Sequence, residues 1–283
     1  MKKFRILILL LIMLCGCSKT SQGLVVNPVS DFEENLKVHF LDVGQADAIV
    51  VELPNKQVML IDAGEKQSGI KIVDYLKKLG YNYLDYVVAT HPHADHIGGM
   101  AEVIVNFDVR NIYMPKVSTN TKTYENLLLT IKDRGLKINA GVAGVEIINE
   151  ENLSIEILAP NNDKYDSLNN YSLVLKLKYG NSSFLFMGDA EKIIENEIKA
   201  DVEADVLKVG HHGSNTSSSE AFLKEVKPEY AIISVGLDNK YGLPKEEIIK
   251  RIEKYTTNIY RTDKDGTIIV SSDGKNITVE KEK

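Results

Sequence analysis

The stretch DYVVATHPHADHIGG, residues 85–99, decides the fold and the chemistry that this sequence predicts. It contains the apolar run YVVA, which is typical of a buried strand. The proline that follows disfavours helix at the residue before it, so a turn leaves the strand. That turn carries four polar side chains within six residues: His91, His93, Asp95 and His96. Imidazole and carboxylate are ligands of zinc and similar divalent ions, so we expect a metal site at the end of this strand.

A similar arrangement recurs in the second half of the chain. The first half has the strand-like run MLI followed by Asp62, and the second half has FLFM followed by GDA, which contains Asp189. The strand DVLKV then leads to the adjacent pair His211 and His212. Ligands in α/β folds lie at the carboxyl ends of strands, so we expect the two halves to converge on one site. His39, which is isolated in a strand, is expected to have an ordinary structural partner.

Strands and helices interleave along the rest of the chain, which indicates the α/β class. Helices are expected where apolar residues recur at helical spacing, and strands where β-branched and aliphatic residues cluster. The expected helices are 68–79, 98–105, 123–134, 190–199, 219–226 and 245–255. The expected strands are 36–42, 48–53, 58–61, 85–90, 109–114, 145–149, 153–158, 171–179, 182–187, 204–209, 229–235, 266–271 and 276–280.

The composition is that of a globular protein. The chain has 283 residues, of which 43% are hydrophobic and 26% charged, so disorder, collagen and coiled coil are disfavoured. A net charge of −6 disfavours a protein that coats nucleic acid through phosphate neutralisation alone, and it leaves room for a local anion site. The only cysteines are Cys15 and Cys17, which excludes a disulfide framework or a cysteine-based zinc finger in the body.

The N-terminus is predicted to be a targeting signal. Residues 1–17 combine a basic start with a nine-residue apolar run, 6–14, which is too short for a membrane span and fits a secretory signal. The ending LCGC resembles the bacterial lipoprotein signal, with Cys17 as the lipidated residue; a plain signal peptide with a chance cysteine is the alternative. Residues 18–35 are polar and predict a tether. We therefore expect a lipid-anchored protein on the extracytoplasmic face of the cell membrane.

The motifs also resemble a known family. HPHADHIGG resembles the HxHxDH signature of the metallo-β-lactamase superfamily. HFLDVGQADA, MLIDAG, LNNYSLVL, FLFMGDAE and DVLKVGHHGSNTSSS together resemble the hydrolase domain of the ComEC/Rec2 competence family, over residues 36–283. The resemblance implies a four-layer αββα sandwich. Competence proteins of this kind also carry membrane channel segments, whereas this sequence has no run of twenty apolar residues. We therefore expect a stand-alone lipoprotein, to which DNA uptake does not carry over.

The resemblance further implies two divalent metal ions, for which we expect zinc, with manganese as the alternative. The implied ligands are His91, His93, Asp95, His96, Asp189 and His212. His91 and His93 would hold one ion, the Asp95 group the other, and Asp189 would bridge them. Asp62 would accept a ring N–H and fix a ligand tautomer. Asp95 and His211 are the implied catalytic residues, with an exchange of roles between His211 and His212 left open.

Three places depart from the family pattern, one of them Ala46, where the family commonly has glycine. Many superfamily members supply a third histidine to the first metal where this chain has Asn169 and Asn170, so an asparagine carbonyl or a water would have to stand in. Leu243 stands where the competence family usually has a histidine after a Tyr-Gly pair, and leucine can neither bind metal nor transfer a proton.

The expected reaction is hydrolysis by a hydroxide bound to two metal ions, acting on a phosphate ester or phosphodiester of a small molecule or nucleic acid. A nuclease or a cell-envelope phosphoesterase fits this expectation, and no obligate protein partner is implied. The alternatives are an acyl hydrolase acting on a lactone or lactam, and a degenerate lipoprotein that binds a ligand without catalysis. Lys208, Ser214 and Asn170 are candidate substrate contacts. For Lys208, an exposed strand lysine is the alternative. The run 213–219 either binds an anion or caps a helix through Ser218 or Ser219.

Overall fold

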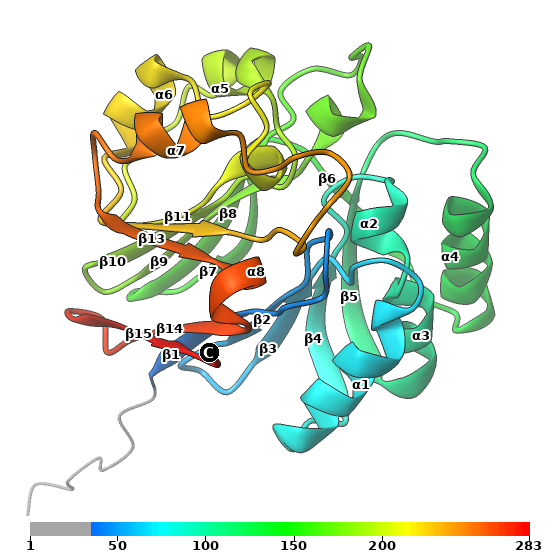
Figure 1. The fold of residues 1–283 in the computed structure, drawn as a ribbon. Coiled ribbons are helices and arrows are strands. Elements are labelled where there is room, and N and C mark those ends of the chain that lie inside the picture. Colours follow the sequence, from blue (N-terminus) through cyan, green and yellow to red (C-terminus); the bar gives the residue numbers. More distant parts are fainter. Residues whose placement is uncertain (1–34) are drawn as a thin grey trace, which may run out of the picture. The chain divides into compact units, whose positions relative to one another are not determined.

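The computed structural model describes residues 35–283, which form two β-sheets packed face to face with helices on both outer sides (Figure 1). This arrangement confirms the four-layer αββα sandwich. The first sheet has the order β15-β14-β1-β2-β3-β4-β5-β6 and the second has the order β13-β12-β11-β10-β9-β8-β7. Within the described residues, no helix has the length and apolar character that crossing a membrane requires.

The first sheet is built mainly from the N-terminal half of the described chain. Its strands are β1 (Leu36–Phe40), β2 (Ile49–Glu52), β3 (Val58–Ile61), β4 (Tyr83–Val88), β5 (Asp108–Pro115), β6 (Ile138–Gly141), β14 (Ile268–Ser272) and β15 (Ile277–Lys281). Its helices are α1 (Ser68–Lys78), α2 (Ala94–Ile97), α3 (Met100–Asn106) and α4 (Lys122–Asp133). The last two strands return to this sheet, where β14 pairs antiparallel with β1.

The second sheet is continuous in sequence apart from its helices. Its strands are β7 (Val145–Asn149), β8 (Leu153–Ala159), β9 (Val174–Tyr179), β10 (Ser182–Phe186), β11 (Val206–Lys208), β12 (Tyr230–Ile233) and β13 (Asn258–Arg261). The accompanying helices are α5 (Lys192–Glu197), α6 (Glu220–Val226), α7 (Glu246–Ile252) and α8 (Thr262–Asp265), with 3-10 turns η1 (Leu168–Tyr171) and η2 (Gly210–Gly213).

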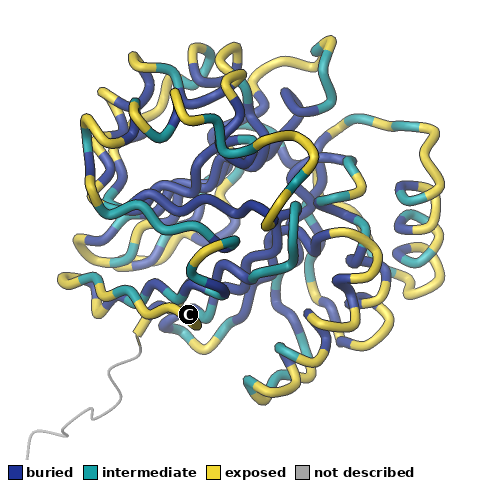
Figure 2. Tube along the Cα trace, viewed as in Figure 1, coloured by how far each residue is buried: buried dark blue, intermediate teal, exposed yellow. Residues whose placement is uncertain are grey.

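Three apolar cores hold the four layers together. Figure 2 shows the inner strands of the sheets as mostly buried and the outer turns as exposed. The central core joins the two sheets, with Phe40 and Met59 from the first facing Phe184 and Phe186 from the second. The other two cores lie between each sheet and its own helices. Complete burial of one such side chain contributes about 1.5–3 kcal/mol, so both faces of each sheet are stabilised.

Some expected elements differ in their limits. The helix expected at 98–105 begins two residues later, as α3 at Met100, and the short helix α2, which was not expected, lies before it at Ala94–Ile97. A Cβ on Gly99 would lie 2.3 Å from the Ala63 carbonyl oxygen, so only glycine allows this close approach to the loop after β3. Residues 171–173 are not strand, since Tyr171 ends η1. The edge strands β6 and β13 and the short helix α8 were not expected from the sequence.

The fold places the site by bringing strand ends together. β3 runs parallel to β4, and β10 runs parallel to β11 and β11 to β12. The carboxyl ends of parallel strands share one edge of a sheet, so the residues that follow β3, β4, β10 and β11 gather there. These are the segments that carry the sequence-predicted ligands.

Candidate metal centre

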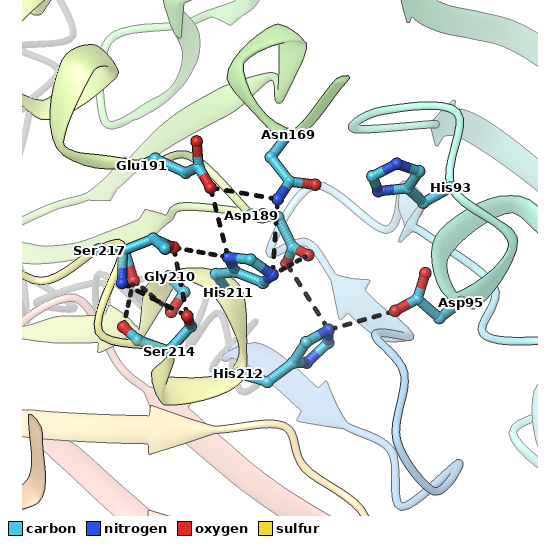
Figure 3. Close-up of polar contacts among 12 residues, drawn as sticks. His93, Asp95, Asn169, Asp189, Glu191, Gly210, His211, His212, Ser214 and Ser217 are labelled. Atoms are coloured by element: carbon cyan, nitrogen blue, oxygen red, sulfur yellow. Dashed lines mark hydrogen bonds and ion pairs between the residues drawn. The ribbon is translucent and has the colours of Figure 1, made fainter. Parts of the chain in front are cut away.

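Four side chains from both halves of the chain meet at this edge: Asp95, His96, Asp189 and His212. Their candidate ligand atoms all lie within 4.8 Å of one another. Asp95 and His96 come from α2, Asp189 from the turn after β10, and His212 from η2 (Figure 3 labels all of these except His96). Of the two adjacent histidines that the sequence left open, His212 is the one that joins this group.

The distances within the group match a coordination sphere. The Nε2 atom of His96 lies 3.3 Å from Asp189 Oδ1 and 4.0 Å from Asp95 Oδ2. The Nε2 atom of His212 lies 3.7 Å from Asp189 Oδ1 and 3.6 Å from Asp95 Oδ2. Ligand bonds of 2.0–2.2 Å at tetrahedral angles separate the ligand atoms by about 3.3–3.6 Å. The four side chains therefore fit one divalent ion.

The unpartnered atoms of the group point to the same conclusion. His96 Nε2, His212 Nε2 and Asp189 Oδ1 are buried, and they find no hydrogen-bond partner among residues 35–283. A buried polar atom left unsatisfied costs about 1–3 kcal/mol. A cation shared by these atoms removes that cost, because each of them can donate a lone pair to it.

The opposite ring nitrogens are occupied, which sets the tautomers. His96 Nδ1 lies 2.7 Å from Asp62 Oδ2, and His212 Nδ1 donates to the carbonyl oxygen of Ser234 at 2.8 Å. Asp62 itself accepts the backbone N–H of Thr90 at 2.8 Å and the Thr90 hydroxyl at 2.7 Å. A histidine whose Nδ1–H is held in this way presents the lone pair of Nε2 to a metal.

Three of the seven described residues other than glycine that have positive φ lie at or beside the centre. Asp62, His211 and His212 have φ values of +57°, +49° and +51°, in the left-handed region that residues other than glycine seldom adopt. Conformations of this kind cost of order 1–3 kcal/mol each and are retained where the surrounding contacts require them. The strain is consistent with side chains aimed at a functional centre.

The two oxygens of Asp189 face different groups. Oδ1 faces His96 and His212, as described, whereas Oδ2 lies 3.9 Å from His91 Nε2 and 3.6 Å from His211 Nε2. His91 Nε2 also lies 2.9 Å from His93 Nδ1, so these two ring nitrogens converge on the Oδ2 side. One carboxylate thus stands between two sets of imidazoles, which is the arrangement that a bridging ligand requires.

Asp47 is a functional residue that the sequence analysis missed. It lies buried between β1 and β2, with Oδ1 3.4 Å from His212 Nδ1 and Oδ2 3.8 Å from His96 Nδ1. It also forms an ion pair with Lys208. The signal was present in HFLDVGQADA, since a second acidic residue follows the first strand within a loop that leads back to the sheet.

The carboxylates give the centre a strong preference for positive charge. Burial opposes protonation of His96, but the charges of Asp189 and Asp62 outweigh it and raise the pKa of His96 well above its ordinary value. At His212, burial lowers the pKa, but the charges of Asp189 and Asp47 outweigh it and raise the pKa to about 10. Burial alone would raise the pKa of Asp189, yet the neighbouring imidazoles lower it far below its ordinary value. In the metal-free protein, protons on these two imidazoles therefore balance the negative charge of the carboxylates, and a bound metal ion would replace them.

The metal-free protein is expected to lose stability as the pH rises above neutrality. The pKa of His212 is raised from 6.5 to about 10, so its contribution is complete below pH 6.5 and is lost as the pH rises through about 10. Metal ligation has the opposite sign, because the imidazoles must release their protons to bind. Thermal unfolding with Zn²⁺ and with EDTA at pH 5.5 and pH 9 measures both effects. The increase in Tm caused by metal should be larger at pH 9, and a larger increase at pH 5.5 would contradict this prediction.

Two of the three candidate substrate contacts, Lys208 and Ser214, have partners within the protein. Lys208 is buried with 1% exposure, and its ammonium group pairs with Asp47 and donates to the Gly188 carbonyl at 3.2 Å. The alternative that Lys208 is an exposed strand lysine is therefore wrong, and its contact with a substrate stays a prediction. The Ser214 hydroxyl turns back to Thr216 within its own loop, at 3.2 Å.

Of the two roles expected for the run 213–219, anion binding or helix capping, the structure shows helix capping through Ser219. The Ser219 hydroxyl accepts the backbone N–H of Phe222 at the start of α6. The carboxylate of Glu195 accepts the backbone N–H groups of Ser218 and Ser219, so the protein itself supplies an anion there.

Leu243 packs against the core between the second sheet and its helices. His39 has the ordinary partners we expected, Glu52 and Tyr75.

The predictions for the N-terminus fall largely outside the described residues. These are the signal peptide 1–17, the lipidated residue Cys17 and all but the last residue of the tether 18–35. They stay predictions.

The comparisons with known proteins agree with the geometry. The model of the metallo-beta-lactamase superfamily matches residues 41–236. ComE operon protein 3 of Bacillus subtilis is 32% identical over 252 residues, covering 82% of this chain and 32% of the relative. Recombination protein 2 of Haemophilus influenzae is 29% identical over 241 residues, covering 83% and 29%. The chain therefore spans about a third of the length of these curated relatives.

A solved structure shows the same fold. The metallo-beta-lactamase fold protein YhfI from Bacillus subtilis has a TM-score of 0.55 and 12% identity, covering 84% of this chain and 99% of the other. With the family match over 41–236, the four-layer sandwich and the His/Asp cluster between its halves, the evidence is sufficient: the chain belongs to the metallo-beta-lactamase superfamily.

Proposed function

We propose that this protein is a metal-dependent hydrolase of phosphate esters that holds two divalent ions and prefers phosphodiesters. The observation that carries the proposal is the position of Asp189, whose two carboxylate oxygens face separate sets of imidazoles. One ion would be held by Asp95, His96 and His212, and the other by His91 and His93, with Asp189 shared. Bound divalent ions supply Lewis acidity, which makes water a better nucleophile and neutralises charge on a phosphoryl oxygen.

The chain's own residues supply the remaining functions. Burial lowers the pKa of His211, so its imidazole is neutral at neutral pH. Its Nδ1 lies 2.9 Å from the Thr216 hydroxyl, which leaves Nε2 as the face directed at the centre. At Asp95, burial raises the pKa, but the imidazoles of His212 and His96 outweigh it and lower the pKa to about 2. This carboxylate therefore stays ionised. A neutral base and a fixed carboxylate thus stand at the edge of the site, in the catalytic roles proposed for them.

Two observations support a phosphodiester over an acyl substrate. The partly exposed side chains at the centre include His93, Asp95, Glu191 and His211, so the approach to it carries polar groups that suit a charged phosphate. The similar proteins of B. subtilis and H. influenzae are named for the ComE operon and for recombination, and recombination acts on a polymer of phosphodiesters.

We further propose that lipidation of Cys17 holds the domain on the extracytoplasmic face of the cell membrane. Fractionation of cells that make the full chain tests this proposal.

A substrate panel tests the proposed activity. The protein is loaded with Zn²⁺ or Mn²⁺ and assayed on bis-p-nitrophenyl phosphate, p-nitrophenyl phosphate, single-stranded DNA and nitrocefin. We expect turnover of the diesters that EDTA abolishes and that added metal restores. Turnover of nitrocefin without any phosphate ester would contradict the proposal, and so would a failure to bind metal.

A further inference from the structure

The turn η1 lies where many members of the superfamily supply a third histidine, and it carries two buried asparagines, Asn169 and Asn170, with 8% and 6% exposure. Asn170 uses both ends of its amide on one neighbour. Its Nδ2 donates to Glu191 Oε2 at 2.9 Å, and its Oδ1 accepts the Glu191 backbone N–H at 3.2 Å. Both ends of the Asn170 amide are thus engaged by Glu191, and its contact with a substrate stays a prediction.

Asn169 differs from its neighbour in one respect. Its Nδ2 points to Glu191 Oε1 at 3.4 Å and to His211 Nε2 at 3.5 Å. An ionised carboxylate only accepts hydrogen bonds, so the NH₂ group of the amide must be the end that faces Glu191. This fixes the orientation of the amide and turns Oδ1 the other way.

The carbonyl oxygen of Asn169 is buried, and within residues 35–283 it has no hydrogen-bond partner. Figure 3 shows it directed away from Glu191, toward the side of the centre where His93 lies. On that side His91 Nε2 and His93 Nδ1 are 2.9 Å apart, and Asp189 Oδ2 is 3.9 Å from His91 Nε2. Two imidazoles and a carboxylate oxygen make three ligands, one fewer than a tetrahedral site needs.

We propose that Asn169 Oδ1 is the fourth protein ligand of the first metal site, in place of the third histidine. Amide oxygens coordinate divalent cations, and coordination would satisfy an atom that otherwise costs about 1–3 kcal/mol. A neutral amide oxygen is a weaker donor to zinc than imidazole, so the first site is the weaker of the two. The assignment rests on the two-ion function proposed above.

Metal titration of matched variants tests the assignment. Isothermal titration of metal-free wild type with Mn²⁺ and with Zn²⁺ should show two equivalents. Asn169→Ala should weaken the second equivalent by at least about tenfold and leave the first unchanged. Asn170→Ala removes the same kind of hydrogen bond to Glu191, so it controls for disturbance of the turn, and it should retain both equivalents.

A charge-matched pair keeps the test decisive if the alanine variants fold poorly. Asn169→Asp and Asn170→Asp each add one carboxylate to the same turn, and only Asn169→Asp should tighten the second equivalent. Equal binding by Asn169→Ala and wild type would overturn the assignment, as would a second equivalent that disappears in His211→Ala instead. Wild type that binds only one ion would remove the two-ion function itself, which separates the two failures.

Discussion

Asp189→Ala is expected to abolish the binding of both metal ions and to reduce phosphodiester turnover by at least about 10²–10³-fold. Within residues 35–283, Asp189 is the carboxylate whose two oxygens face both sets of imidazoles, at 3.3 and 3.7 Å on one side and 3.6 and 3.9 Å on the other. Its removal takes a ligand from each ion and leaves four histidines without their shared anion. Metal analysis of the purified variant and turnover of bis-p-nitrophenyl phosphate measure the two effects.

The control for this variant is Asp201→Ala. Asp201 lies in the same half of the chain and its side chain is 64% exposed, so its removal changes the net charge by the same amount without touching the centre. Metal content and turnover should match wild type. If Asp189→Ala kept two ions, or if its turnover stayed within a few-fold of Asp201→Ala, the shared carboxylate would not be the organising group.

Lys208→Met is expected to lower the free energy of unfolding by about 3–5 kcal/mol, because it leaves a buried carboxylate without its cation. Among residues 35–283, Lys208 is the one lysine or arginine that forms an ion pair with Asp47, whose other partners are the rings of His212 and His96. Both Lys208 and Asp47 are almost wholly buried. Methionine keeps most of the length of the side chain and removes the ammonium group, with its ion pair to Asp47 and its hydrogen bond to Gly188. Urea unfolding of the metal-free protein measures the loss.

Two further variants decide whether charge is the cause. The double variant Asp47→Asn with Lys208→Met removes both charges and should recover most of the lost stability, which appears as coupling in a double-mutant cycle. Lys176→Met is the matched control, because Lys176 is buried on the neighbouring part of the same sheet and pairs with the exposed Asp201. Water can solvate that partner, so the loss should be much smaller. Equal losses for the two lysines would contradict the explanation.

The sequence was sufficient for the layers and for the ligand groups. Clusters of apolar residues predicted the bounds of most strands to within two or three residues, because a strand buried between two layers needs apolar side chains. His91, His96, Asp189 and His212 could be grouped because each follows a strand, and parallel strands end at one edge. The strands and the convergence of the two halves follow from local pattern and one general rule of topology, whereas the four layers and the ligand set came from the resemblance of the motifs to a known family.

The remaining features depend on contacts between distant parts of the chain. Lys208 follows two apolar strand residues and could be interpreted as exposed, because its partner Asp47 comes from the other half of the protein. The difference between Asn169 and Asn170 arises from a single 3-10 turn and from Glu191, which no periodicity reveals. The strands β6 and β13 were missed because each is a short edge strand with few buried residues.

The origin of the ligands has a mechanical consequence. Asp95 and His96 are attached to the first sheet's layer, and Asp189 and His212 to the second sheet's layer. Any ion that they share is therefore a cross-link between two layers that otherwise adhere through apolar contacts and a few polar ones, such as the Asp47–Lys208 ion pair. Chelation would let the layers separate first at that edge, so resistance to proteolysis there would report how fully the protein is loaded.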